Sequence, residues 1–137
     1  MSHKKVFALL VSAGDESFES LRTLLKAQGV EVWVSQSCKE AARLLEQTHP
    51  ELIFTTTQLI DGTWCDMVIM AENASAPANV IVAGRFKDHR LHIAAIDYGA
   101  FDFILPPFKS ESVGQVVRVA AEDVRRRREA QALRAVA

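Results

Sequence analysis

Short apolar runs alternate with helical patterns five times along the chain. The runs occupy residues 5–11, 30–34, 51–55, 79–83 and 101–105. They are rich in Val, Ile and Phe, which is typical of strands. Three of them are apolar nearly throughout, and strands with two apolar faces occur in parallel sheets that helices cover on both sides. The pattern therefore predicts a covered parallel sheet.

The segments between these runs carry helix signals. Residues 19–29 place leucines on one stripe and stop at Gly29, a good C-terminal stop. Residues 37–49 begin at Ser37 with Glu40 three positions later, the pattern of a capping box. The last helix is expected to begin near Ser110. Its apolar positions recur at helical spacing and are Val113, Val116, Val117, Ala120 and Val124.

The third and fourth crossovers are less regular. Residues 61–74 are apolar enough for a short helix, which is followed by a loop. Residues 87–99 end at Gly99 and form a clearer helix pattern. The apolar residues of that pattern are Leu91, Ile93, Ala94 and Ile96.

Five strand and helix units of about 20 to 25 residues predict a right-handed, doubly wound α/β domain. For five strands we expect the flavodoxin-like order 2-1-3-4-5, with helices on both faces. We expect this domain to span residues 1–122. Residues 123–137 contain no helix breaker and should extend the last helix, as a linker to an output domain or as a dimer helix.

Composition and charge narrow the possible partners and locations. A chain of 137 residues can bury a core without a metal or disulfide, and its net charge of -1 gives no general attraction to nucleic acid or membrane. It has no signal peptide and no apolar run near 18 residues, so a cytoplasmic location is expected. Cys38 and Cys65 lack a ligand spacing and are expected to pack as small hydrophobic residues.

Two other polar features have ordinary interpretations. His89 and His92 could touch on one helix face, but without acidic or cysteine partners they are expected to be solvated and not to bind zinc. The basic run VRRRRE at residues 124–129 has Glu122, Asp123 and Glu129 beside or within it. It is therefore expected to form a solvated helix face, with no direct nucleic-acid binding.

Three stretches together resemble one known family. They are LLKAQGVEVWVSQSCKEAARLL at residues 24–45, HPELIFTTTQLIDGTWCDM at residues 49–67 and AIDYGAFDFILPPF at residues 95–108. In this order and spacing they resemble the receiver (CheY-like) domain of two-component response regulators, over roughly residues 4–122. The last two stretches are the more telling, because the LIDG turn and the GAFDFILPPF segment occur together.

The resemblance implies a chemistry at the carboxyl ends of the strands. Receivers carry two acidic residues after the first strand, which help to hold Mg²⁺, and an aspartate at the end of the third strand, which accepts a phosphoryl group from a histidine kinase. They also carry a Ser or Thr after the fourth strand and a Lys at the end of the fifth. Carboxylates suit a hard cation, and the amine and hydroxyl steer the transferred group.

None of these five positions keeps its chemistry in this chain. The acidic pair falls on Ser12 and Ala13, the acceptor on Thr56, the hydroxyl position on Gly84 and the lysine on Pro106. The resemblance therefore implies a degenerate receiver, or pseudo-receiver, without the phosphoacceptor aspartate. Its strand edge should be electrically neutral and should need no Mg²⁺ or other cofactor.

Two sets of acidic residues could rescue the phosphorylation chemistry. Asp15 and Glu16 lie just past the missing pair, but acids at a helix start usually stabilise its N-terminus. Asp61 could be a displaced acceptor, although Asp-Gly is an ordinary turn pair. These residues keep open the alternative of a receiver that is phosphorylated through non-standard residues.

A small-ligand site is another alternative. The small neutral residues at positions 12, 13, 56 and 84 could leave a pocket at the strand edge of a flavodoxin-like domain.

Phe103 matches the aromatic position that turns inward or outward when receivers are activated, although such a residue would pack in the core of any similar fold. A cis bond before Pro107 is also expected from the resemblance.

From the resemblance and the five changed positions, we expect a non-enzymatic, phosphorylation-independent signalling module, the N-terminal regulatory part of a transcriptional regulator. It should form a homodimer through the fourth helix, fifth strand and fifth helix, and act on a partner protein or an output domain.

Overall fold

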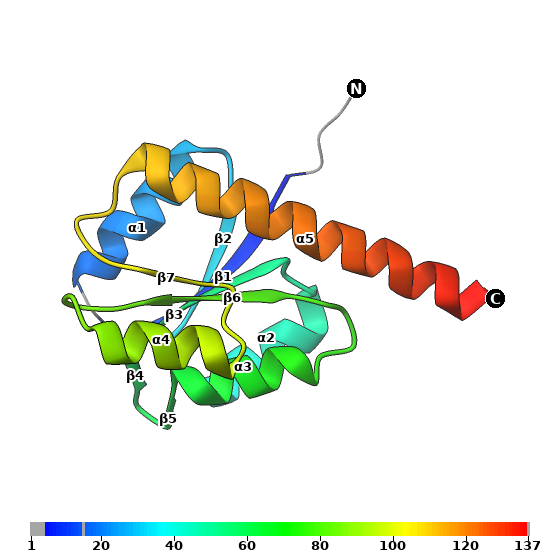
Figure 1. Cartoon of the computed structure of the whole chain (residues 1–137), viewed down its shortest axis with the longest axis horizontal. Coiled ribbons are helices and arrows are strands. Elements are labelled where there is room, and N and C mark those ends of the chain that lie inside the picture. The colour runs from blue at the N-terminus through cyan, green and yellow to red at the C-terminus, as the bar shows by residue number, and fades with distance from the viewer. Residues whose placement is uncertain (1–4, 15, 137) are drawn as a thin grey trace.

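A computed structural model describes residues 5–14 and 16–136, and it contains a central sheet of five parallel strands (Figure 1). The strands are β1 (Phe7–Val11), β2 (Glu31–Ser35), β3 (Leu52–Thr56), β6 (Asn79–Ala83) and β7 (Asp102–Ile104). Their order in the sheet is β2-β1-β3-β6-β7. Because β6 and β7 are the fourth and fifth sheet strands along the chain, the predicted order 2-1-3-4-5 is confirmed.

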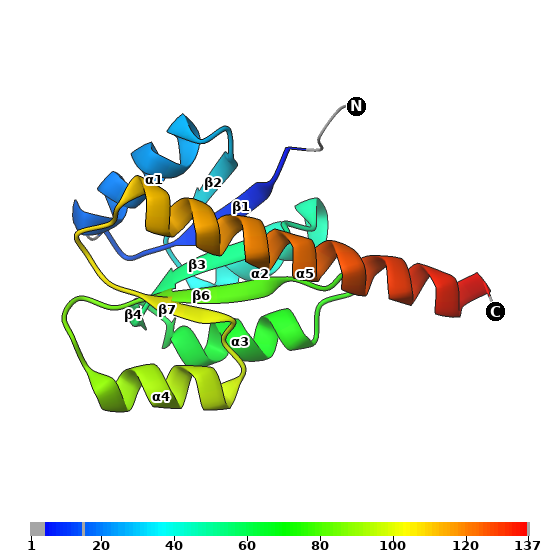
Figure 2. The same cartoon turned by 45° about the horizontal axis from the view of Figure 1, so that its top comes forward.

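Five helices cover both faces of this sheet (Figure 2). They are α1 (Glu16–Ala27), α2 (Cys38–Thr48), α3 (Trp64–Glu72), α4 (His89–Tyr98) and α5 (Ser110–Val136). Helices α1 and α5 pack on one face, and α2, α3 and α4 pack on the other. Figure 2 shows the two helical layers above and below the strands. The described residues contain no helix that is long and apolar enough to cross a membrane.

The sheet explains why the strand sequences are apolar on both faces. Alternate residues of β1 and β3 contribute to two separate cores: Leu9 and Ile53 pack toward α2 and α3, whereas Leu10 and Phe54 pack toward α1 and α5. All five residues of β3 and all five of β6 are buried. Polar chemistry is therefore confined largely to the ends of the central strands.

Several predicted helix ends are confirmed. The side chain of Ser37 accepts a hydrogen bond from the backbone N–H of Glu40 at the start of α2. Gly29 and Gly99 follow α1 and α4 with φ angles of 82° and 124°, which favour glycine. Helix α3 begins with a capping box formed by Thr63 and Asp66.

A small hairpin between β3 and α3 was not predicted. Its strands, β4 (Gln58–Leu59) and β5 (Gly62–Thr63), are two residues long and too short for a periodic signal. At its turn, the carboxylate of Asp61 accepts hydrogen bonds from the N–H groups of Cys38 and Lys39, at 2.7 and 3.0 Å. These bonds hold the pKa of Asp61 below its ordinary value. Asp61 is therefore a turn residue that also caps α2.

The two cysteines pack as expected. Cys38 is buried and Cys65 is partly buried, and neither forms a disulfide bond. Burial, followed by the nearby charge of Asp61, raises the pKa of the Cys38 thiol to about 11. The thiol of Cys38 is therefore protonated at neutral pH.

Helix α4 covers the sheet less completely than its apolar sequence suggests. Within this fully described helix, Ala95 is the one buried residue. The side chains of Ile93, Ile96 and Tyr98 are 62%, 43% and 46% exposed. Their exposure leaves an apolar surface beside β7.

The basic run on α5 differs from its prediction. We expected residues 124–129 to form a solvated face, but Arg125, Arg127 and Arg128 bond to groups outside α5. Helix α5 runs without a break from Ser110 to Val136, as the predicted extension of the last helix requires. Its interactions with the body of the domain are described below.

Candidate functional site

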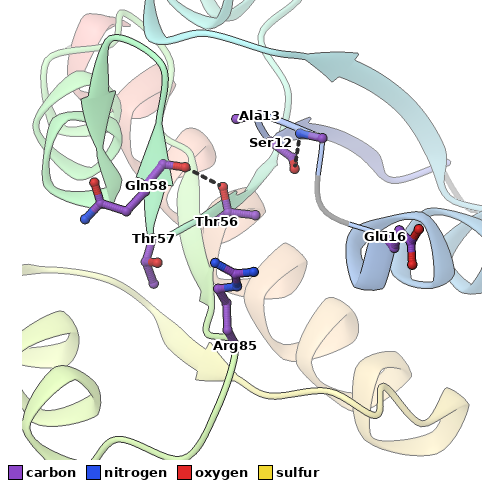
Figure 3. Close-up of a pocket in the computed structure, with 8 residues that line it drawn as sticks. Ser12, Ala13, Glu16, Thr56, Thr57, Gln58 and Arg85 are labelled. Carbon is purple, nitrogen blue, oxygen red and sulfur yellow. Dashed lines mark hydrogen bonds between the residues drawn. The ribbon is translucent and has the colours of Figure 1, made fainter.

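A polar pocket of about 520 Å³ lies at the carboxyl edge of the sheet, where β1 and β3 end (Figure 3). In open parallel sheets, ligands and catalytic groups gather at this edge. The lining residues come from the loops after β1, β3 and β6 and from the start of α1. They are Ser12, Ala13, Gly14, Glu16, Thr56, Thr57, Gln58 and Arg85.

The loop after β1 contributes two neutral residues, Ser12 and Ala13, where the resemblance predicted that an acidic pair would be missing. Ser12 is buried, and its N–H donates to the carbonyl of Ser35, which continues the pairing of β1 with β2. Its hydroxyl oxygen accepts a hydrogen bond from the N–H of Gly14 at 3.2 Å. Ala13 is exposed and offers no polar side-chain atom. Neither residue supplies a carboxylate ligand for a cation.

Thr56 is the last residue of β3, the position to which the resemblance assigned the acceptor aspartate. It is buried, and its hydroxyl donates to the carbonyl of Gln58 at 3.1 Å. The hydroxyl of Thr55 donates in turn to the carbonyl of Thr56 at 2.9 Å. Because the proton of Thr56 is bonded to a carbonyl, this contact does not activate the oxygen as a nucleophile. The contact instead stabilises the turn that leads into the hairpin.

Gly84 does not line the pocket, contrary to the prediction that its small size would help to open one. It is buried after β6, and its N–H donates to the carbonyl of Ile104. A Cβ atom at this position would lie 2.6 Å from Cζ of Phe103 and 3.0 Å from Cδ2 of Leu105. The space beside Gly84 is therefore already filled by the ring of Phe103.

Phe103 on β7 is buried, as its packing interpretation predicted. Its ring stacks on that of His92 from α4, with centroids 5.1 Å apart and planes inclined by 20°. His92 is exposed on α4, as predicted, and one side of its ring also contacts Phe103. Phe103 connects the space beside Gly84 to the position of α4.

Pro106 lies after β7 and is partly buried, outside the set of residues that line the pocket. The peptide bond between Pro106 and Pro107 is cis, as predicted. A proline ring carries no charge and cannot replace the amine of a lysine.

The strand edge is not as neutral as the sequence indicated, because Arg85 and Glu16 line the pocket. In Figure 3, the guanidinium group of Arg85 points toward Thr56. Sequence reasoning missed Arg85, although its place just after a buried strand and Gly84 was a usable signal.

Asp15, the other acidic candidate, lies outside the described residues. The described residues bring no three His, Cys, Asp or Glu side chains together into a group that could hold a metal ion.

The pocket thus brings together three of the five predicted site positions. Ser12, Ala13 and Thr56 line it, whereas Gly84 and Pro106 do not. The site offers buried hydroxyls, a guanidinium group and one carboxylate.

Comparison with known proteins identifies the fold. No protein-family model and no curated protein sequence matches the chain. Among solved structures, the signal receiver domain of an HD domain-containing protein from Pseudomonas fluorescens has a TM-score of 0.80 at 18% identity. That match covers 94% of this chain and 96% of the other.

Two further structures are similar. The signal receiver domain of a protein described as a Luxo repressor from Vibrio parahaemolyticus has a TM-score of 0.78 at 20% identity, and the match covers 89% of this chain and 94% of that domain. The beryllofluoride-activated NtrC4 receiver domain dimer has a TM-score of 0.75 at 22% identity, with coverages of 86% and 98%. With the observed strand order, these likenesses show that the chain has the flavodoxin-like, CheY-like fold of response-regulator receiver domains.

Proposed function

We propose that this chain is a degenerate receiver domain that acts as a non-enzymatic, phosphorylation-independent signalling and interaction module. The observation that carries the proposal is Thr56, whose buried hydroxyl is bonded to a carbonyl where a receiver has its acceptor carboxylate. Thr56 has no charge with which to attack a phosphoryl group or to bind a cation. The receiver-like fold supports a role in two-component signalling, because its surfaces can contact other proteins without phosphotransfer to the domain.

The other site positions support the same proposal. Ser12 and Ala13 supply no carboxylates, and Pro106 supplies no cationic amine. A working receiver needs all of these groups together, since the cation, the acceptor and the lysine balance one another's charge. Restoring a single residue would not restore this balance. We therefore expect no phosphotransfer and no requirement for Mg²⁺.

The absence of phosphorylation can be tested directly. The purified chain is incubated with acetyl phosphate and Mg²⁺ and its intact mass is measured, with a phosphorylatable receiver as positive control. We expect no phosphate adduct, because no carboxylate stands at position 56. A stoichiometric adduct would contradict the proposal, and its loss in T56A would identify Thr56 as the acceptor.

We further propose that the inward position of Phe103 is a fixed feature of the signalling surface. The ring occupies the space that a side chain at position 84 would need, and it stacks on His92 of α4. A hydroxyl residue at position 84 and an inward Phe103 are therefore sterically incompatible without local rearrangement. Gly84 allows the inward position to persist without a bound phosphoryl group.

This steric coupling predicts an unusual effect of a Gly84→Ala substitution. The φ angle of Gly84 is not in the left-handed region, so alanine would ordinarily stabilise the fold by about 0.4–1 kcal/mol. We expect G84A instead to destabilise it by about 1–3 kcal/mol, because the new Cβ meets the Phe103 ring. Urea unfolding measures both values.

The matched comparison is the same substitution in an F103A background. There the ring is absent, so adding G84A should cost much less or should stabilise the fold. A stabilising G84A in the presence of Phe103 would show that the two positions are not coupled.

The proposed interaction surface includes α4, β7 and α5, and we propose that the chain forms a homodimer through it. The exposed side chains of Ile93, Ile96 and Tyr98 give α4 an apolar surface, and such surfaces favour contact with another protein. Val119 on α5 adds a further exposed apolar side chain. The NtrC4 receiver domain with this fold is described as a dimer. Burying the α4 surface in a second copy would remove these side chains from water.

Sedimentation velocity over a range of protein concentrations tests this interface. We expect concentration-dependent dimers, and we expect I93E to shift the protein toward monomers, because a charge would be buried in the contact. The matched control is I60E, since Ile60 is 75% exposed and lies on the β4–β5 hairpin, which is not part of α4, β7 or α5. A chain that is monomeric throughout, or equal effects of both variants, would contradict the interface.

The biological setting is part of the proposal. We infer that the domain is the N-terminal regulatory part of a cytoplasmic transcriptional regulator and acts on a partner protein or an output domain. Helix α5 leaves the domain beyond the amino edge of the sheet and provides a natural connection (Figure 1). The domain itself is expected to bind neither DNA nor membranes.

A second candidate function is favoured by the pocket at the carboxyl edge. Its volume of about 520 Å³ is within the range of small-molecule sites. The buried residues Ser12 and Thr56 and the side chain of Arg85 suit a small polar compound that carries a negative charge. Such a ligand could regulate the domain in place of phosphorylation.

Ligand-observed NMR with a library of small carboxylate and phosphate fragments tests this candidate. We expect fragments to bind the wild type and to lose binding in A13W, because a large ring at the exposed Ala13 would fill the pocket. I60W is the matched control and should retain binding. Failure of all fragments to bind, or equal binding to A13W, would contradict the ligand site while leaving the interaction module intact.

A further inference from the structure

The four consecutive arginines of α5 differ sharply in their surroundings. The side chain of Arg126 is 76% exposed, and it bonds to Asp123 on the same helix. Arg125, Arg127 and Arg128 instead bond to groups of other elements. Of the four arginines, only Arg126 is therefore a solvated basic residue of the kind that is usual in a charged helical run.

Arg125 attaches α5 to the start of β3. Its Nε and Nη2 donate to Oε2 of Glu51, at 3.2 and 3.0 Å, and Glu51 is buried. The other carboxylate oxygen of Glu51 accepts from the backbone N–H of Phe7 at 2.9 Å. One carboxylate therefore joins the amino ends of β1 and β3 to the helix. Removing the arginine would leave a buried acid without its cationic partner.

Arg127 attaches α5 to the start of β6. It donates to the amide oxygen of Asn79 and to Oδ2 of Asp123. The amide nitrogen of Asn79 donates to the carbonyl of Ala120 and to Asp123, both at 3.0 Å. Burial would raise the pKa of Asp123, but these bonds from Asn79 and Arg127 outweigh that effect and lower it. Both the oxygen and the nitrogen of the Asn79 amide are thus bonded to groups of α5.

Arg128 bonds to the two loops at the amino edge of the sheet. Its guanidinium donates to the carbonyls of His49 and Pro50, before β3, and to that of Pro77, before β6, at 2.9–3.0 Å. A planar guanidinium can serve three acceptors in fixed directions, which a lysine cannot. Gln131, one turn further on, donates to the carbonyl of Ser75 at 3.1 Å.

These contacts extend the attachment of α5 well beyond its apolar face. Val113 and Val117 pack against the sheet, Val124 is also buried, and polar contacts then continue from Arg125 to Gln131. The helix has 27 residues and is therefore about 40 Å long. Residues 132–136 are exposed and follow the last of these contacts.

The structure assigns Arg125, Arg127 and Arg128 a mechanical role: they clamp α5 to the amino edge of the sheet, so that the helix leaves the domain as a rigid arm. A domain or a second copy joined through this helix would be held at a fixed angle rather than on a flexible linker. This role goes beyond the proposed function and does not depend on it, because the clamp is at the opposite edge from the pocket.

Distance measurements between two spin labels test the arm. One label is placed on α1 by T23C and the other near the end of α5 by L133C, in a C65S background. Cys38 is buried and protonated, which protects it from labelling. Labelled protein is mixed with excess unlabelled protein, so that double electron–electron resonance reports distances within one chain. We expect a single narrow distance distribution.

Arg128→Ala is the decisive variant, and Arg126→Ala, two positions earlier on the same helix, is its matched control. R128A should lose the narrow peak, because three carbonyls lose their shared donor and the end of the helix can swing or fray. R126A should keep the wild-type distribution, since among the described residues Arg126 bonds only to Asp123 of its own helix. A broad distribution in the wild type, or equal distributions for both variants, would overturn the proposal.

A conservative variant keeps the test valid if R128A fails to fold. R128K retains the charge but lacks the planar set of donors, so its distribution should be broader than that of the wild type. Amide hydrogen exchange of residues 125–131 should rise in the same variant. A folded R128K with wild-type distances and wild-type exchange would show that the three-carbonyl contact does not fix the arm.

Discussion

Burial of both faces of a parallel sheet is the constraint on which the rest of this structure depends. The residues of β3 and β6 are buried throughout, so these strands leave polar groups little room except at their ends. The two edges of the sheet, where the strands begin and end, carry different groups. The carboxyl edge carries an open pocket with hydroxyls, whereas the amino edge carries a dense network of arginines, carbonyls and buried polar side chains. The two edges therefore differ in the interactions that they make: one is open to solvent, and the other binds α5.

At the carboxyl edge, packing and local hydrogen bonds hold the ends of the strands and the loops that follow them. Thr56 bonds to the carbonyl of Gln58 at the start of the hairpin, and Phe103 fills the space that Gly84 leaves open. The same ring stacks on His92, so the packing at this edge reaches α4 and its exposed apolar surface. Packing thus connects the side chains at this strand edge to the surface that we propose for interaction.

At the amino edge, buried charge is tolerated because it is fully bonded. Glu51 accepts from both a backbone N–H and Arg125, and Asn79 uses its oxygen and its nitrogen. Burial lowers the pKa of Arg128, whose guanidinium is surrounded by carbonyl oxygens. Such contacts have a strict geometry, which makes them suited to fixing the direction of α5 rather than merely adding stability.

The sequence by itself determined the order of elements, the strand positions within one or two residues, most helix ends and the residue types at the ends of the strands. These features follow from local periodicity, from glycines and caps, and from residue types at known spacings. Only the tertiary structure decided where the arginines bind, because Arg125 and Glu51 are 74 positions apart and nothing local links them. It also decided that Arg85 enters the pocket, that Phe103 closes the space beside Gly84, and that the apolar side of α4 stays exposed. Each of these depends on which segments the fold brings side by side, and that information is absent from any single stretch of the chain.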